Sequence, residues 1–108
     1  MNDRQTEKTV FWHRELPPLG ATAIGEHTVE ATSAHAPGAL LHRDELWDRC
    51  YRDLMDRTHQ RIEQEIARLG GDYARVLSEA IEPRRNEVTD EAWLHGQFTY
   101  QLYSLHVS

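Results

Sequence analysis

The chain is organised around the stretch from Asp44 to Leu69, which reads DELWDRCYRDLMDRTHQRIEQEIARL. Apolar and aromatic side chains recur in it every three or four residues, which is the repeat of an α-helix with one buried face. These positions are Trp47, Tyr51, Leu54, Met55, Thr58, Ile62, Ile66 and Leu69. Asp44 suits the N-cap position, and Gly70–Gly71 ends the pattern. The spacing therefore predicts one long amphipathic helix.

Opposite charges four residues apart cover the other side of this predicted helix. Examples are Asp53–Arg57 and Arg61–Glu65. Each such pair contributes only ~0.2–0.5 kcal/mol, so the pairs indicate a solvated face. Asp56, His59 and Glu63 lie on the same side, and an acid three residues before a histidine is a spacing that metal-binding helix bundles use. A single helix supplies too few ligands, so we expect these three side chains to belong to the charge network.

Three segments outside the helix have the composition of β-strands. They are Ala21–Ser33, Asp72–Glu82 and Ala92–His106, the last being rich in aromatic and β-branched residues. Pro83 is expected to end the second segment. The order strand, helix, strand, strand predicts an α+β fold, with a single-layer, three-stranded mixed sheet packed on the helix. The first two strands suit a right-handed parallel crossover, and the last two suit an antiparallel hairpin.

The first 20 residues are expected to form an N-terminal arm, and residues 21–108 a single α+β domain. Val10, Phe11 and Trp12 are a short apolar cluster, which we interpret as an arm or short strand that packs onto the domain. Pro17–Pro18 follows it, and two successive prolines favour an extended path.

Charge and composition exclude several classes of partner. The formal net charge is -6, which argues against nucleic acid because phosphate binding requires a basic face. No apolar run approaches the ~20 residues that span a bilayer, and the first ten residues lack an apolar signal segment. The single cysteine, Cys50, has no partner for an internal disulfide. We therefore expect a cytoplasmic protein with neither a membrane nor a nucleic-acid partner.

Period-two alternation assigns two faces to the predicted sheet. The face toward the helix holds Val29, Ala31, Ala74, Val76, Ser78, Ala80, Leu94, Phe98, Tyr100 and Leu102. The opposite face holds Glu26, Thr28, Glu30, Tyr73, Arg75, Leu77, Glu79, Trp93, His95, Gln97, Thr99, Gln101 and Tyr103. One helix covers one face, so the opposite face meets solvent, a second subunit or a ligand.

Two functional hypotheses follow from this uncovered face. The first is a domain without catalytic activity or cofactor that forms a homo-oligomer through its sheet. The alternative is binding of a small molecule or a metal by Glu30, Arg75, Trp93, His95, Gln97 and Tyr103. If Glu30 or Glu26 lies opposite His95, the two side chains make a His–carboxylate pair that serves as a base or a ligand. The seven histidines show no HxH or HExxH spacing, so no metal ligands are assigned. An enzyme is a third option without a supporting motif.

The stretch from Ile62 to Tyr103 resembles the small bacterial YbjQ-like proteins, which are described as heavy-metal-binding. The resemblance rests on the helix end Ala67–Gly71, the strand Tyr73–Ile81 and the Phe98-Thr99-Tyr100 run near the end of the last strand. It covers less than half of the chain. It implies a compact strand–helix–strand domain that assembles into a ring. No ligand motif matches residue by residue, so the resemblance does not imply metal binding here.

Overall fold

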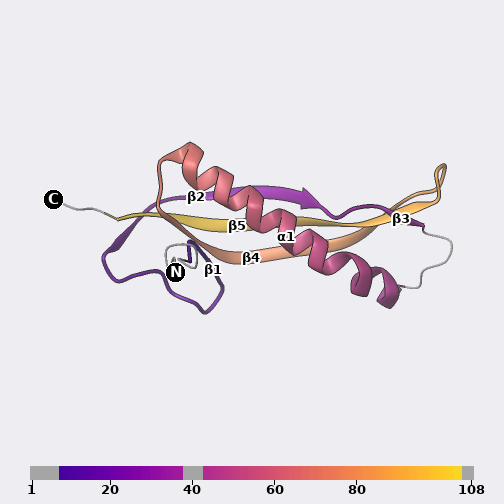
Figure 1. Ribbon diagram of the computed structural model, residues 1–108, viewed down its shortest axis with the longest axis horizontal. Helices are drawn as coiled ribbons and strands as arrows, with labels where there is room; N and C mark the ends of the chain where they lie inside the picture. Colours follow the sequence, from indigo (N-terminus) through magenta and orange to yellow (C-terminus); the bar gives the residue numbers. More distant parts are fainter. Residues whose placement is uncertain (1–7, 38–42, 106–108) are drawn as a thin grey trace, which may run out of the picture.

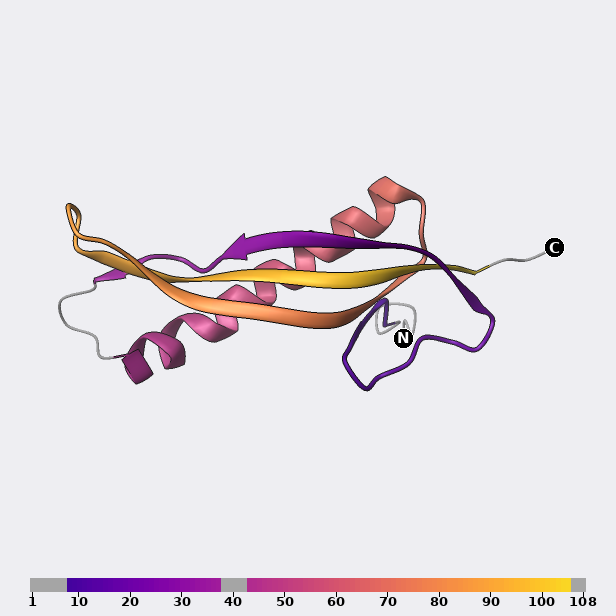
Figure 2. The same cartoon turned by 180° about the vertical axis from the view of Figure 1, so that it is seen from behind.

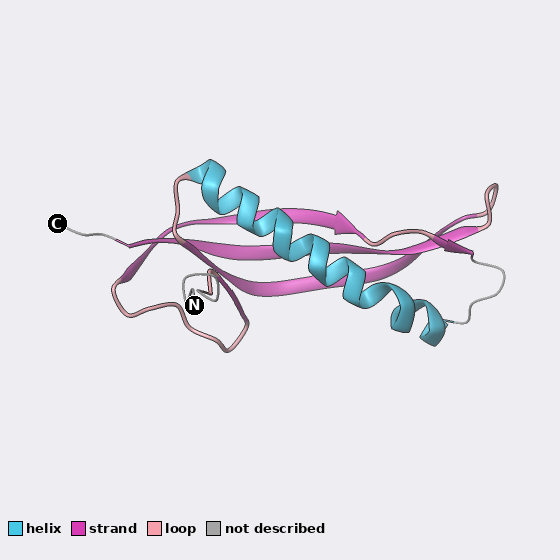
Figure 3. Cartoon of the chain, viewed as in Figure 1, coloured by secondary structure: helices cyan, strands magenta, loops and turns pink. Residues whose placement is uncertain are grey.

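The computed structural model describes residues 8–37 and 43–105, and it shows one helix lying across one face of a sheet (Figure 1). The helix is α1 (Arg43–Leu69). The strands are β1 (Val10–Trp12), β2 (Ala21–Thr32), β3 (Ala36–Pro37), β4 (Tyr73–Asn86) and β5 (Glu91–Leu105). The α+β class and the packing of a single-layer sheet on a long helix are confirmed (Figure 3).

The strand order is β1-β4-β5-β2, with β3 paired to β5 beyond the end of β2. The prediction of three strands is wrong, because β1 joins the sheet as a parallel neighbour of β4. The Ala74 amide donates to the Thr9 carbonyl and the His13 amide to the Val76 carbonyl, both at 2.9 Å. β5 is antiparallel to both β4 and β2. β2 and β4 therefore run parallel, as expected of a crossover, but β5 lies between them.

α1 ends at Leu69 as predicted and begins one residue before the predicted start. Gly70 has a positive φ of 76°, and the Gly71 amide donates to the Ile66 carbonyl at 2.9 Å, which closes the helix end. The buried stripe consists of Leu46, Cys50, Leu54, Thr58, Ile62 and Ile66. The predicted stripe is therefore wrong at its start, where Leu46 and Cys50 face the sheet and Tyr51 is 40% exposed.

The core lies between this stripe and the face of the sheet that α1 covers. β5 contributes Leu94, Phe98, Tyr100 and Leu102, each buried, in agreement with the predicted alternation. Gly96 lies within that row. A Cβ there would be 2.5 Å from Cε1 of Phe98 and 3.3 Å from Cδ2 of Leu54, so only glycine allows the ring and the helix to approach this closely.

A β-bulge in β4 changes which residues face the helix. The register passes from Val76 opposite Tyr100 to Ser78 opposite Thr99, so Leu77 is an extra residue. Beyond it the alternation reverses, because a one-residue shift turns every following side chain to the other face. The predicted assignment of β4 side chains to the two faces is therefore wrong after Leu77. Ser78 and Ala80 lie away from α1, and Glu79 lies on the side of α1.

β4 continues through Pro83 to Asn86, although Pro83 was expected to end it. Ala74 and Val76 point their backbone groups toward β1. After the bulge, the backbone groups of Glu79, Ile81 and Pro83 point to this same edge. β1 does not extend that far, so the edge is open there. Proline at an open edge removes no ladder hydrogen bond, so the strand tolerates it. His106, expected to end the last strand, lies outside the described residues.

Candidate functional site

The face of the sheet opposite α1 has no helix over it in the described structure (Figure 2). We call it the outer face. From the register it holds Glu26, Thr28, Glu30 and Thr32 of β2; Arg75, Ser78, Ala80, Glu82 and Arg84 of β4; and Trp93, His95, Gln97, Thr99 and Gln101 of β5. Almost all of these side chains are polar, so the outer face is a hydrogen-bonding surface, with Trp93 near one end and Tyr73 and Tyr103 near the other.

The predicted His–carboxylate pair exists on this face, and its acid is Glu30. Nε2 of His95 lies 3.1 Å from Oε1 of Glu30, and the two side chains are 17% and 61% exposed. Glu82 occupies the position opposite His95 on the other neighbouring strand. Its Oε2 accepts a hydrogen bond of 2.7 Å from Nη2 of Arg84, which lowers the pKa of Glu82 below its usual range. A row of alternating acid and base thus crosses three strands.

These residues surround a hollow of about 520 Å³ on the outer face. Its lining consists of Glu30, Ala80, Ile81, Glu82, Arg84, His95 and Gln97. The small side chain of Ala80 opens the hollow, and carboxylates stand on both flanking strands. Such a lining suits a small polar ligand with a positively charged group. Within residues 8–37 and 43–105, no three His, Cys, Asp or Glu side chains are grouped so as to hold a metal ion.

The six residues predicted as one ligand site do not converge. Glu30, His95 and Gln97 share the hollow. Trp93 stacks instead on His35, with ring centroids 4.1 Å apart and planes at 16°. Arg75 donates through Nε to the His13 carbonyl at 2.8 Å. Tyr103 lies ten positions from Trp93 along β5, a separation of about 33 Å in an extended strand.

Sequence reasoning missed Ala80, Glu82 and Arg84 because it continued the alternation of β4 through Leu77. One signal was present in the sequence. Val76 and Ile81 are both apolar and five residues apart, an odd separation that puts both on one face only if the strand contains a bulge. Both do pack toward the core in the structure.

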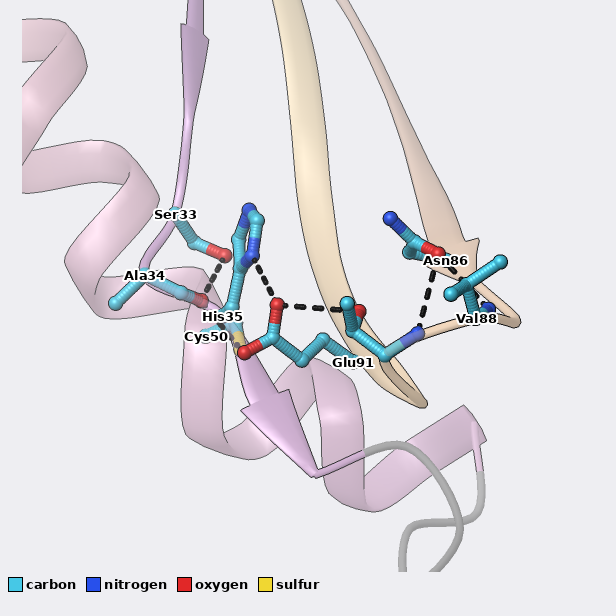
Figure 4. A network of polar contacts seen from close by, with 8 residues as sticks. Ser33, Ala34, His35, Cys50, Asn86, Val88 and Glu91 are labelled. Carbon is cyan, nitrogen blue, oxygen red and sulfur yellow. Dashed lines mark hydrogen bonds and ion pairs between the residues drawn. The ribbon is translucent and has the colours of Figure 1, made fainter.

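Beyond the hollow, His35 in the segment between β2 and β3 packs on the outer face (Figure 4). Nδ1 of His35 lies 3.1 Å from Oε1 of Glu91, and Thr89 donates to the same carboxylate oxygen at 3.4 Å. Oδ1 of Asn86 accepts from the Val88 amide at 2.9 Å. These contacts hold the β4–β5 turn and keep His35 over Trp93, so this end of the face is structural.

Histidines elsewhere in the described chain also pair with glutamates. His13 lies 3.2 Å from Glu79, and His59 lies 3.2 Å from Glu63 on α1. The second pair involves two members of the Asp56, His59 and Glu63 set, as expected of a charge network. His42 and His106 lie outside the described residues.

Comparison with known proteins adds no relative. No family model, no curated protein and no solved structure matches the chain. The resemblance to the YbjQ-like proteins therefore stays a prediction. α1 is the only helix in the described residues, and it lacks the apolar length that crossing a membrane requires.

Proposed function

We propose that this chain is a self-associating domain in which two copies join their sheets edge to edge through β2. β2 has 12 residues and lies at the end of the strand order. Among the described residues, only β5 pairs with it. An unpaired edge strand of this length is a template for another strand, and this open edge is the observation that carries the proposal.

The direction of the backbone groups identifies the residues that would pair. The Ser33 amide donates to the Leu94 carbonyl of β5 at 2.9 Å. Because the groups of successive residues in an antiparallel strand point to opposite sides, those of Glu26, Thr28, Glu30 and Thr32 point to the open edge. Four residues thus have donors and acceptors available to a second strand.

The opposite edge of the sheet is less suited to pairing. Part of β4 is covered by β1, and the uncovered part carries Pro83, which has no amide to donate. Glu79 and Arg85 flank it with charge. Charges and prolines on an edge oppose strand addition, so β2 is the edge that remains for self-association.

Charge selects the register of the pair. Two-fold symmetry is the commonest symmetry of dimers, and the proposed dimer has it, with the two β2 strands antiparallel. Placing Thr28 opposite Thr28 of the second copy would put Glu26 opposite Glu30, and like charges in that position repel. Placing Thr28 opposite Glu30 of the second copy puts Glu26 opposite Thr32, which removes the conflict. The proposed dimer has this second register, with both helices on the same side of one continuous sheet.

Amide exchange tests the proposal residue by residue. In a dilute solution, the amides of Glu26, Thr28, Glu30 and Thr32 have no backbone partner and exchange quickly. As concentration rises, we expect all four to become protected, while those of Glu79 and Ile81 on the other edge stay fast. Thr28→Pro removes an edge amide and should abolish the protection of the other three, whereas Thr28→Ser should keep it. Fast exchange of all four amides at high concentration would contradict the proposal.

The register has its own test at Thr32. In the proposed register this residue lies opposite Glu26 of the second copy. Thr32→Lys should therefore tighten the dimer and Thr32→Glu should weaken it, as measured by the dilution at which protection of the Thr28 amide is lost. Equal effects of the two variants would contradict the register but not the pairing of β2.

A second candidate function is binding of a small organic cation in the hollow on the outer face. The His95–Glu30 pair, with Glu82 on the other side of His95, favours it, because the two carboxylates flank one opening. Titration with agmatine, followed by amide chemical shifts of Gln97 and His95, tests this candidate. Ala80→Leu should fill the hollow and abolish the shifts, while Ala67→Leu on the exposed side of α1 should not. Unchanged shifts in the unmodified chain would exclude the binding of such a cation.

The proposal places the domain in the cytoplasm. Its support is the chemistry of Cys50, the only cysteine in the sequence, which is buried and forms no disulfide. A reducing compartment suits such a chain. Fractionation of cells that express the tagged chain tests this location, and recovery outside the cytoplasm would contradict it.

A further inference from the structure

The loop between β1 and β2 holds an apolar segment out in solvent. Leu16, Pro17, Pro18 and Leu19 follow one another there, and we call them the proline–leucine loop. Leu16 is 67% exposed and Leu19 is fully exposed. The only hydrogen bond in which this segment takes part within the described structure is the one that the Pro18 carbonyl accepts from Ala21. Two successive prolines favour a preformed extended path, which loses little entropy on binding.

The start of this loop is nevertheless held firmly. The carboxylate of Glu15 accepts a hydrogen bond of 2.7 Å from the Trp12 amide and a second one from Lys8. Both contacts lower the pKa of Glu15, that with Lys8 the more. The loop therefore projects from an anchored start and exposes two leucines, and a monomeric protein seldom exposes apolar side chains together without a use.

A complementary surface lies near the beginning of α1. The rings of Trp47 and Tyr51 stack there with centroids 5.8 Å apart and planes at 29°. With Asp48 and Arg52 they line a hollow of about 350 Å³, which we call the aromatic hollow. This is the place where the predicted helix stripe was wrong, because Leu46 and Cys50 fill the core and leave Tyr51 exposed.

The two surfaces match in chemistry. Extended proline segments bind in grooves that are lined with aromatic rings. Charge matches as well. Arg14 precedes the loop, and Asp48 borders the hollow. Neither side chain forms an ion pair within the described part of the chain, so each is available to the other.

A single chain cannot make this contact. The proline–leucine loop and the start of α1 lie toward opposite ends of the molecule (Figure 1), whose longest dimension is 57 Å. The occupant of the hollow must therefore come from another molecule, and a second copy of this chain carries the required loop.

We propose that the proline–leucine loop of one copy docks in the aromatic hollow of the next copy, with Arg14 facing Asp48. The contact joins two different surfaces, so successive copies form a ring or an open filament. It uses neither the open edge of β2 nor the outer face. It is thus a second mode of association, independent of the proposed pairing through β2.

Sedimentation velocity tests the contact between loop and hollow. The Thr28→Pro variant is used throughout, because it prevents pairing through β2. We expect the Thr28→Pro variant to form species larger than a monomer as its concentration rises. Leu16→Ser with Leu19→Ser, or Tyr51→Ser alone, should each leave it monomeric. A 1:1 mixture of these two variants should form a dimer and nothing larger, because one supplies an intact loop and the other an intact hollow. A mixture that stays monomeric would overturn the proposal.

Charge reversal provides the matched control. Arg14→Asp and Asp48→Arg should each weaken association about fivefold, as expected for one surface ion pair turned into a repulsion. The chain that carries both changes should recover the affinity of its parent. Lack of recovery would overturn the pairing of these residues, and a monomeric parent at every concentration would overturn the whole proposal. Binding of the loop to another protein from a lysate, with no association between copies of this chain, would also contradict the proposal.

Discussion

His95 of the central strand and Glu30 of the edge strand form an ion pair of 3.1 Å on the outer face. This pair connects β5 to the strand whose free backbone groups we propose for self-association. Glu30 also belongs to the open edge, where Glu26 and Glu30 alternate with threonines. The same contact therefore belongs both to the hollow and to the edge.

Because Glu30 is 61% exposed, its pairing with His95 contributes little to stability. A double-mutant cycle with His95→Gln and Glu30→Gln should give a coupling free energy of less than about 1 kcal/mol. Urea unfolding of the dilute protein measures it, and added salt should reduce it further. A coupling free energy that is unaffected by salt would contradict this description of the pair.

Tyr100 carries a hydroxyl group that is buried without a hydrogen-bond partner among the described residues. Burial also raises the pKa of this phenol. Removing the unsatisfied group with Tyr100→Phe should raise the free energy of unfolding by about 1 kcal/mol. Urea unfolding checks this, with Tyr103→Phe on the other side of β5 as a control of little effect. A clear loss of stability in Tyr100→Phe would show that the hydroxyl is bonded in solution.

Gly96 should not tolerate a larger side chain. A Cβ at this position would lie 2.5 Å from Cε1 of Phe98, so Gly96→Ala should destabilise the fold by about 1–3 kcal/mol. Gly20→Ala is the matched control, since its Cβ would meet Leu105 at an ordinary 3.4 Å. Thermal unfolding compares the two, and adding Phe98→Leu should restore part of the stability that Gly96→Ala removes. Equal stability of the two alanine variants would contradict the close packing at Gly96.

Acid should release the loop that follows β1. The hydrogen bonds from Lys8 and the Trp12 amide lower the pKa of Glu15 from its ordinary value of 4.5. A lowered pKa means that the contribution of Glu15 to stability is complete above pH 4.5 and is lost as pH falls through the lowered value. The Trp12 amide should therefore exchange more slowly in the unmodified chain than in Glu15→Gln near neutral pH.

That difference should vanish in acid, where the carboxyl group is protonated in both states of the unmodified chain. Glu87→Gln, in the turn between β4 and β5, should leave the exchange of Trp12 unchanged throughout. A difference between Glu15→Gln and the unmodified chain that persists at low pH would contradict the assignment to this carboxylate.

The pairing of β1 with β4 was only partly predictable from the sequence. The apolar run from Val10 to Trp12 indicated a segment that packs on the domain, but its three residues do not specify a neighbour. It pairs with β4 because the backbone groups of Ala74 and Val76 point away from β5 and form hydrogen bonds with Thr9 and His13. Which strand lies at an edge depends on the order of the whole sheet, and local pattern does not contain that order.

The sequence by itself determined the long helix, the start of β2, and the two faces of β5. Helix and strand periodicity are local, since each follows from which neighbouring side chains need burial. The tertiary structure decided that the bulge lies at Leu77, which brought Glu82 and Arg84 beside the His95–Glu30 pair. The tertiary structure also decided that Cys50 is buried in the core and Tyr51 is not. The path of α1 across the sheet determines which edge of a broad apolar stripe is buried.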